Sequence, residues 1–394
     1  MLDAERRLAA AGFVATAVSY GPARMGFALF LPEFREAFTL SSTQAGLIAA
    51  AAFGGQLAAL GLARPLTARI GPGVAVTLGM LLAALGLATV ASAADAGVLA
   101  AGIVVAAMSA GLAWSPYNDA ADRIARPDRR ADVLSVISTG TTVGIGTAAL
   151  LALALVLADL GWRPAWTLFA VAATGALALN LVTFRVFGRP PAWPPRREGT
   201  GARPRLGLPI AVCAFVFGFT SAVFIAFASD RIAAAGGLTG VPPGTAPPLV
   251  FAVFALAGGV GMATGRLERW IGLGGLIRAI FTAAALSLVL LAVAPASWPA
   301  MVASAALQGA CVMMASAKLA FWSARLSPDF PTAGFTTVLL VYAGGSILGP
   351  AVAGVGLDVA GPQATFAAVA LLAAATAVVV RPDAASRTAP RPSA

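Results

Sequence analysis

The chain has 394 residues, of which 59% are hydrophobic and only 11% are charged, and its mean hydropathy is +0.88. This composition excludes a soluble globular domain, because such domains carry about 25% charged residues. The net charge of +10 and pI near 11.2 are compatible with nucleic-acid binding, but the basic residues are scattered over short connections beside apolar segments. We therefore predict a polytopic membrane protein without a nucleic-acid partner, whose basic connections face the lipid headgroups of the bilayer.

Twelve apolar segments are long enough to cross the hydrocarbon core of a bilayer as helices, which takes about 20 residues. They cover residues 8–31, 44–63, 73–92, 97–118, 133–158, 164–187, 207–229, 248–265, 273–294, 298–321, 331–357 and 362–380. The absence of strict alternation excludes a transmembrane β-barrel. Arg6 and Arg7 precede the first segment, but that segment contains Arg24 and no small-residue cleavage pattern. We therefore expect a retained first helix and not a signal peptide.

A stretch rich in Pro, Gly and Arg, GRPPAWPPRREGTGARPRLG, divides the twelve segments into six and six. We expect an N-terminal bundle over residues 1–187, a cytoplasmic linker over 188–206, a C-terminal bundle over 207–380 and a disordered cytoplasmic tail over 381–394. The halves repeat weakly, since RPDRRADVLSVISTGTTVGIG at helix five is similar in outline to SPDFPTAGFTTVLLVYAGGSILG at helix eleven. Asp159 and Asp358 then close these two helices. Two parallel repeats related by a pseudo-two-fold axis are therefore expected.

The basic residues indicate the orientation of the chain. Of the 26 Lys and Arg residues, 21 fall on one side in alternate connections or at the termini, and only Arg35, Arg163 and Arg231 fall on the other. By the positive-inside rule the richer side is cytoplasmic. We therefore expect a multi-pass protein of the bacterial cytoplasmic membrane with both termini inside. The remaining two cations, Arg24 and Lys318, lie within apolar segments.

Helix eleven contains GGSILGPAVAG, in which Gly345, Gly349, Pro350 and Gly354 fit the pattern G-x-x-x-G-P-x-x-[GA]-G. The connections RPLTARIGP and GRLERWIG keep parts of a G-x-L-x-D-R-x-G-R loop, without its aspartate. On these motifs the chain resembles the major facilitator superfamily over essentially its whole length. The resemblance implies two six-helix bundles that alternate a central cavity between the two sides of the membrane, with helices one, four, seven and ten lining it.

In that superfamily the glycine-proline pattern is most typical of helix five of antiporters. Here helix five has Gly140 and Gly144, with Ile145 in place of the proline. Two interpretations of Gly345, Gly349 and Pro350 stay open. Small residues allow close helix packing, and a Gly-Pro bend allows a helix to flex during gating.

Polar residues within the spans indicate where a solute would bind. Thr16, Tyr20 and Arg24 are spaced by four on helix one, and Ser304, Gln308, Cys311, Ala315 and Lys318 form a similar stripe on helix ten. A charged side chain at the bilayer centre costs at least ~2.5 kcal/mol, so it normally faces water or a partner. We expect a substrate site formed by Tyr20, Arg24, Trp114, Tyr117, Asn118, Ser221, Gln308 and Lys318.

Less specific roles remain open for several of these residues. Arg24 could pair with Glu33 or reach the headgroups, and Lys318 could extend to the cytoplasm beside Arg325. Trp114 and Tyr117 could belong to an aromatic belt at the interface. Gln56, Thr142 and Tyr342 are weaker candidates for the site.

Proton coupling, if present, cannot use an imidazole, because the chain contains no histidine. The candidate coupling residues are Glu33, near the outer end of helix one, and Asp119, near the inner end of helix four. We favour Asp119 paired with Lys318 across the two bundles, although Asp119 could instead pair with nearby Arg123 or Arg126.

The sequence contains no catalytic triad, paired intramembrane carboxylates or phosphate-binding loop, so we expect no enzyme and no cofactor. Cys213 and Cys311 lie in different spans, so we expect no metal site. The expected function is that of a monomeric secondary transporter for a small anionic or carboxylate-bearing solute, with protons as a possible coupling ion. The alternatives are an efflux pump for amphiphilic compounds, and a membrane sensor or assembly factor that does not transport.

Overall fold

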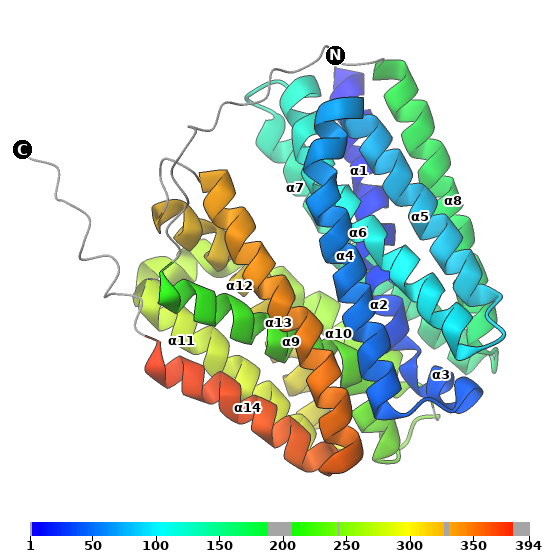
Figure 1. The fold of residues 1–394 in the computed structure, drawn as a ribbon, viewed down its shortest axis with the longest axis vertical. Helices are drawn as coiled ribbons and strands as arrows, with labels where there is room; N and C mark the ends of the chain where they lie inside the picture. Colours follow the sequence, from blue (N-terminus) through cyan, green and yellow to red (C-terminus); the bar gives the residue numbers. More distant parts are fainter. Residues whose placement is uncertain (1, 188–206, 243, 327–330, 381–394) are drawn as a thin grey trace, which may run out of the picture.

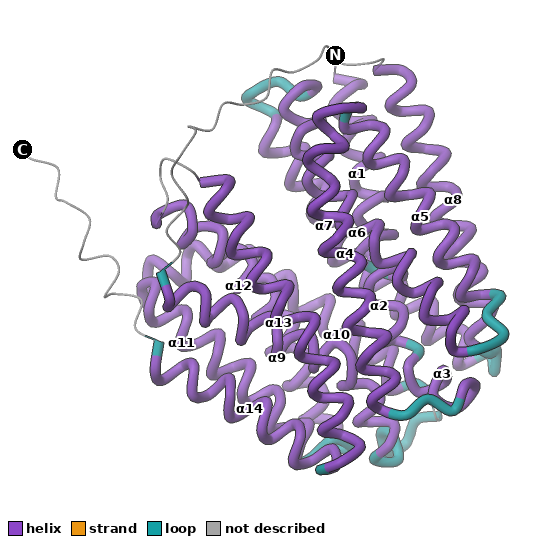
Figure 2. Tube along the Cα trace, in the orientation of Figure 1, coloured by secondary structure: helices purple, strands orange, loops and turns teal. Residues whose placement is uncertain are grey.

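The computed structural model describes residues 2–187, 207–242, 244–326 and 331–380, and these residues form helices and connecting loops without a strand (Figure 2). The first half of the chain contains α1 (Leu2–Tyr20), α2 (Pro22–Leu29), α3 (Leu31–Phe38), α4 (Ser42–Ile70), α5 (Pro72–Ala91), α6 (Ala96–Ile124), α7 (Arg130–Leu157) and α8 (Trp162–Phe187). The second half contains α9 (Leu208–Ala234), α10 (Ala246–Gly258), the 3₁₀ helix η1 (Gly259–Ala263), α11 (Thr264–Val293), α12 (Trp298–Leu326), α13 (Pro331–Val359) and α14 (Gly361–Val379).

The predicted all-helical fold with twelve crossings is confirmed in the described chain. Ten of its helices are long and apolar enough to cross a membrane by themselves. The first crossing is divided into α1 and α2 at Gly21, because Pro22 has no N–H to continue the helical ladder. The eighth consists of the short α10 and of η1, which follows a Gly258–Gly259 step.

One connection differs from the sequence-based expectation. GRLERWIG, expected as a loop between the eighth and ninth crossings, is helical from Thr264 onward and belongs to α11. The helix bends at Gly272, where φ is 69° and ψ is 172°. This backbone conformation favours glycine, since a Cβ is strained there.

The helices alternate between two ends of the molecule. We call the end where α8 finishes and α9 begins the linker end, and the opposite end, where α3 lies, the α3 end. The helices of the two halves converge toward the α3 end and spread apart toward the linker end (Figure 1). Across the halves α4 packs against α13, α7 against α10, and α3 against α9. The expected linker (188–206) and tail (381–394) lie outside the described residues.

The two halves repeat one helix contact in detail. Gly140 and Gly144 of α7 approach the backbone carbonyls of Phe13 and Ala17 in α1 so closely that a Cβ would clash. Gly345 and Gly349 of α13 approach the carbonyls of Phe215 and Phe219 in α9 in the same way. Small residues let two backbones touch, and their matched positions support the predicted internal repeat.

Candidate functional site

A cavity that is partly open to solvent lies between the two halves, and the space within it, solvent included, is about 360 Å³. It is lined by Arg24, Phe27 and Ala28 of α2, by Ala49, Ala52, Phe53 and Gln56 of α4, by Ala107 of α6, and by Ile225 and Ala226 of α9. Its lining residues come from the first, second, fourth and seventh crossings. Most of the wall is apolar, and Arg24 is the charged residue in it.

Aromatic rings hold the Arg24 guanidinium at this cavity. Its central carbon lies 5.6 Å from the ring centroid of Tyr20 and 5.6 Å from that of Phe53. Such contacts attract a cation without using its N–H donors. The buried Nε of Arg24 has no hydrogen-bond partner among the described residues. Among the described residues Arg24 thus has neither a carboxylate partner nor an ion pair with Glu33, and a donor remains available for a solute.

The remaining member of the predicted stripe on helix one, Thr16, points elsewhere. Its hydroxyl donates to the carbonyl of Ile137 in α7 at 2.6 Å, and its side chain is fully buried. Each four-residue step on a helix rotates the side chain by about 40°, so a stripe spaced by four drifts around the axis. Together with the interruption at Gly21, this drift separates Thr16 from Tyr20 and Arg24.

Lys318 forms an ion pair inside the second half. Its Nζ lies 2.6 Å from Oε1 of Glu268 in α11, and the same oxygen lies 3.0 Å from Nη2 of Arg325. The Lys318 side chain is only 2% exposed. The structure therefore pairs Lys318 with Glu268. Contrary to our expectation, it does not bring Lys318 together with Asp119.

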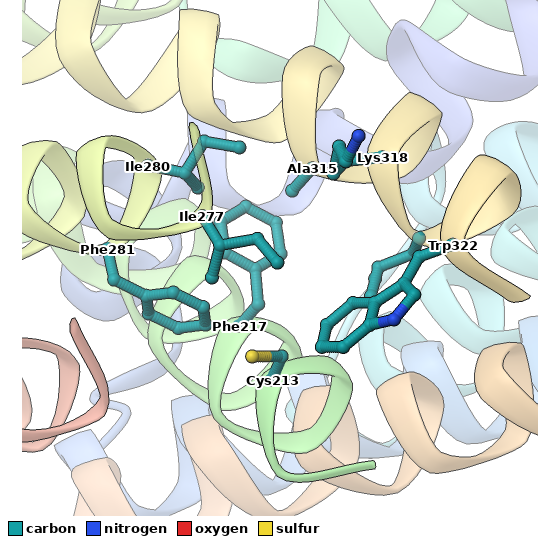
Figure 3. A pocket seen from close by; sticks show the side chains of 9 residues that line it. Cys213, Phe217, Ile277, Ile280, Phe281, Ala315, Lys318 and Trp322 are labelled. Atoms are coloured by element: carbon teal, nitrogen blue, oxygen red, sulfur yellow. The ribbon is translucent and has the colours of Figure 1, made fainter. Parts of the chain in front are cut away.

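A second space, of about 280 Å³, borders the stem of Lys318 (Figure 3). Its other lining residues are Cys213, Phe217, Ile277, Ile280, Phe281, Ala315, Leu319 and Trp322. They all belong to α9, α11 and α12, so this space lies within the second half and not between the halves. Figure 3 shows the Lys318 nitrogen pointing away from Cys213 and Phe217.

The rest of the predicted stripe on helix ten also points into the second half. Ser304 of α12 exchanges hydrogen bonds with Ser287 of α11, and the Cys311 thiol donates to the carbonyl of Ile280. Gln308 lies between them along the stripe, is fully buried, and has no partner for either amide atom among the described residues. Ser221 of α9 is also buried, and its hydroxyl donates to the carbonyl of Phe217 at 2.6 Å. None of these residues lines the cavity that contains Arg24.

The predicted residues on helix four separate into two groups. Tyr117 is fully buried, and its hydroxyl donates to Oδ1 of Asn180 in α8, so it lies inside the first half. Trp114 is 36% exposed, and the amide of Asn118 donates to the Trp114 carbonyl at 3.0 Å. Asp119 is half-buried nearer the linker end, where its electrostatic neighbours are Arg123, Asp122 and Arg64.

Polar contacts join the two halves at the α3 end. The Asp358 carboxylate of α13 accepts hydrogen bonds from the backbone N–H groups of Ser42 and Thr43 at 3.1 and 2.8 Å, and from the Thr43 hydroxyl at 2.7 Å. A residue of one half thus caps a helix of the other. In addition, Nη1 of Arg35 lies 2.6 Å from Oδ2 of Asp230.

The predicted gating residues occupy a closely packed part of α13. Gly345 and Gly349 contact α9 within the second half, whereas the Pro350 carbonyl approaches Gly46 of α4 in the first half. The close-packing interpretation therefore applies to all three residues in this structure. The gating role of Gly345, Gly349 and Pro350 stays a prediction.

Sequence reasoning missed two residues of importance. Phe53 was not considered, because an aromatic ring in an apolar helix carries no sign that it faces a cation. Glu268 lies within the GRLERWIG stretch, but no feature of the neighbouring sequence relates it to Lys318 on another helix. By contrast, Gln56 was expected only as a weak candidate and does line the cavity.

Comparisons with known proteins agree with this architecture. The family model of the major facilitator superfamily matches residues 9–296. No curated protein matches the sequence. Among solved structures, the nucleoside transporter NupG has a TM-score of 0.74 at 12% identity, covering 98% of this chain and 100% of its own. A bacterial homologue of the human lysosomal transporter Spinster, in an inward-facing and unoccupied conformation, has a TM-score of 0.68 at 18% identity, covering 98% of this chain and 97% of its own.

At these identities the two solved structures establish a shared fold and nothing about the solute. The family match covers well over half of the chain and agrees with the twelve crossings and the cavity between the halves. The chain therefore belongs to the major facilitator superfamily and is a multi-pass membrane protein of the secondary-transporter type.

Proposed function

We propose that this protein transports a small organic monocarboxylate by alternating access, and that Arg24 binds the carboxylate. The observation that carries the proposal is the Arg24 guanidinium at the cavity, held by two aromatic rings and with Nε free of any partner among the described residues. A guanidinium binds a carboxylate through two parallel hydrogen bonds, and such bonds strengthen where water is excluded.

The charge balance of the cavity favours one carboxylate and not two. Lys318, the second cation predicted for the site, is neutralised by Glu268 outside the cavity. A dicarboxylate would therefore bring a second negative charge into an apolar space without a partner, which is costly. A monocarboxylate leaves the occupied site neutral.

The walls of the cavity indicate the rest of the solute. Phe27, Phe53 and Ile225 offer apolar contacts, and Gln56 offers one amide that can donate or accept a hydrogen bond. We infer a solute with an apolar body and one further polar group.

The distribution of arginines supports an orientation for this function. We propose that the linker end faces the cytoplasm of a bacterial cell and that the α3 end faces the periplasm. The arrangement in Figure 1, with the halves joined at the α3 end, would then correspond to the inward-facing state.

The test is solute binding and flux with the purified protein. Thermal stabilisation is screened across monocarboxylates, dicarboxylates, nucleosides and amphiphilic cations, and the best solutes are then tested for counterflow in proteoliposomes. Losing a charge-assisted hydrogen bond costs about 1.5–3 kcal/mol, so R24Q should weaken binding of the best monocarboxylate at least tenfold. R24K should lie between R24Q and the wild type, because it keeps the charge and loses the fork. R278Q, which alters an exposed arginine of α11, is the matched control.

Each rival function has its own outcome in this experiment. Unchanged affinity in R24Q would remove Arg24 from the site. Counterflow of amphiphilic cations without response to carboxylates would favour the efflux pump. Neither stabilisation nor flux with any class of solute would favour a sensor or assembly factor.

A further inference from the structure

The short helix α3 is fixed to the first half by an aromatic cluster. Phe30, Phe34 and Phe38 recur every four residues and therefore share one face of the helix. The ring of Phe34 lies 5.0 Å from that of Trp162 and 5.6 Å from that of Trp166, both in α8. This face packs α3 against α8 of the first half.

Other side chains of α3 meet the second half. Arg35 forms its ion pair with Asp230 of α9, and its Nε donates to the Leu40 carbonyl at 3.1 Å. Glu33, in the first turn of α3, approaches the loop before α10. Its Oε1 lies 3.9 Å from where a Cβ would stand on Gly244. Both acidic and basic side chains of this short helix are thus placed at the junction between the halves.

One oxygen of the Glu33 carboxyl has no partner that would stabilise a negative charge at this junction. Its Oε2 is buried and lacks a hydrogen-bond partner among the described residues. An ionised carboxylate that loses water without gaining a partner is strongly disfavoured, whereas the neutral acid is tolerated. Separation of the halves at the α3 end would hydrate Glu33 and remove that penalty.

Charged groups around Glu33 do not replace the missing partner. On α3 itself, Arg35 is directed to Asp230, and the exposed Glu36 repels a negative charge.

On α9, Arg231 donates to the carbonyls of Leu291 and Ala292 within the second half. The stretch between Arg231 and Arg266, which includes Gly244, contains no charged residue. At the ends of α7 and α8, Asp159 is exposed and Arg163 stacks over Trp162 at 4.3 Å.

We propose that the Glu33 carboxyl is a proton-binding site whose occupation stabilises the closed state of the α3 end. In the proposed step a hydronium ion in the solution at that end gives its proton to Glu33, the carboxylate becomes a neutral acid, and the halves can close over it. Loss of the proton to water favours reopening. The inference rests on the proposed alternation between two states, but it does not depend on the identity of the solute.

The direction of the titration agrees with this geometry. Burial raises the pKa of Glu33 from 4.5 to about 7. The backbone N–H of Glu33 itself lowers this pKa, and the nearby charge of Glu36 raises it further. A group whose pKa is higher in the closed state favours that state at low pH. The preference fades as pH rises from about 4.5 and is lost above about 7.

The experiment measures the opening of the α3 end directly. Spin labels are placed on A94C, in the exposed loop before α6, and on A234C, at the exposed end of α9, and distances are recorded in proteoliposomes between pH 5 and 9. The natural Cys213 and Cys311 are 2% and 3% exposed, so they should remain unlabelled. The labelled protein without a further substitution should lose the population in which the two labels are close together as pH rises through about 7. In E33Q that population should persist at all pH values.

Two further variants complete the design. E36Q changes an exposed acid on the same helix and should keep the pH response, while E33L, neutral like E33Q, should also remain closed. A pH response in E33Q equal to that of the wild type, or no response in the wild type, would overturn the proposal. Failure of the transport proposal would look different, because carboxylate binding would be absent while the Glu33-dependent response remained.

Discussion

Lys318 and Glu268 form a buried ion pair between α12 and α11, with Nζ 2.6 Å from Oε1 and the lysine side chain 2% exposed. The pair lies inside the second half, so the only lysine of the chain links two helices there and does not line the cavity that contains Arg24. Arg325 shares Oε1 of Glu268, but its side chain is 62% exposed. These environments lead to different expectations for the two cations.

The ion pair should matter for stability through the cost of an unpaired buried charge. We expect E268Q to destabilise the protein by roughly 3 kcal/mol, because it leaves Lys318 buried without a countercharge. The double variant E268Q/K318M should recover most of that loss, and R325Q should change stability by less than about 1 kcal/mol. Thermal unfolding in detergent measures all three. Additive losses in the double variant would contradict the pairing.

Tyr117 should act in packing and not in solute binding. Its hydroxyl donates to Asn180, whose own amide donates to the Ala176 carbonyl at 2.8 Å. We expect Y117F to lower stability by about 1–2 kcal/mol, since it leaves a buried acceptor unsatisfied, and to leave solute affinity unchanged. Y20F is the counterpart beside Arg24, where the Tyr20 hydroxyl lies 3.5 Å from the Ala110 carbonyl. A weaker solute affinity in Y117F would return Tyr117 to the substrate site.

Asp358 should favour the joined state of the α3 end. It caps α4 from the other half of the molecule. Loss of a charged cap costs about 0.5–1 kcal/mol, so D358N should increase the open population twofold to fivefold, measured with the same pair of spin labels at pH 6. D159N changes the equivalent acid at the end of α7 and provides the control. Equal populations in D358N and the wild type would show that the cap does not hold the halves together.

The orientation of the chain is testable with reporter fusions. Fusions after Asp95 and Ala235 should report the periplasm, because they follow odd-numbered crossings in the proposed topology. Fusions after Ala68 and Arg269 should report the cytoplasm, where the positive-inside rule places the arginine-rich connections. Alkaline phosphatase and green fluorescent protein give opposite signals at each site. A cytoplasmic signal after Ala235 would exclude the proposed orientation or the number of crossings.

The sequence alone determined the crossings and the family, because both depend on local properties. Hydrophobic length is a property of one segment, and the GGSILGPAVAG motif is read within one helix. The pairing of Tyr20 with Arg24 was also predictable, since the two residues are one helical turn apart. The closing acids Asp159 and Asp358 were recognised from the repeat, but the contact of Asp358 with α4 was not.

Only the tertiary structure decided which polar stripe faces the cavity. A helical stripe defines a direction relative to its own axis, and the rotation of that axis depends on packing against helices distant in sequence. For this reason the stripe ending in Lys318 was expected to bind solute, whereas it faces α11 and meets Glu268 there. Arg24 reached the cavity because the interruption at Gly21 and the rings of Tyr20 and Phe53 direct it there. The partner of a buried charge is set by such three-dimensional contacts, and no spacing along the chain encodes it.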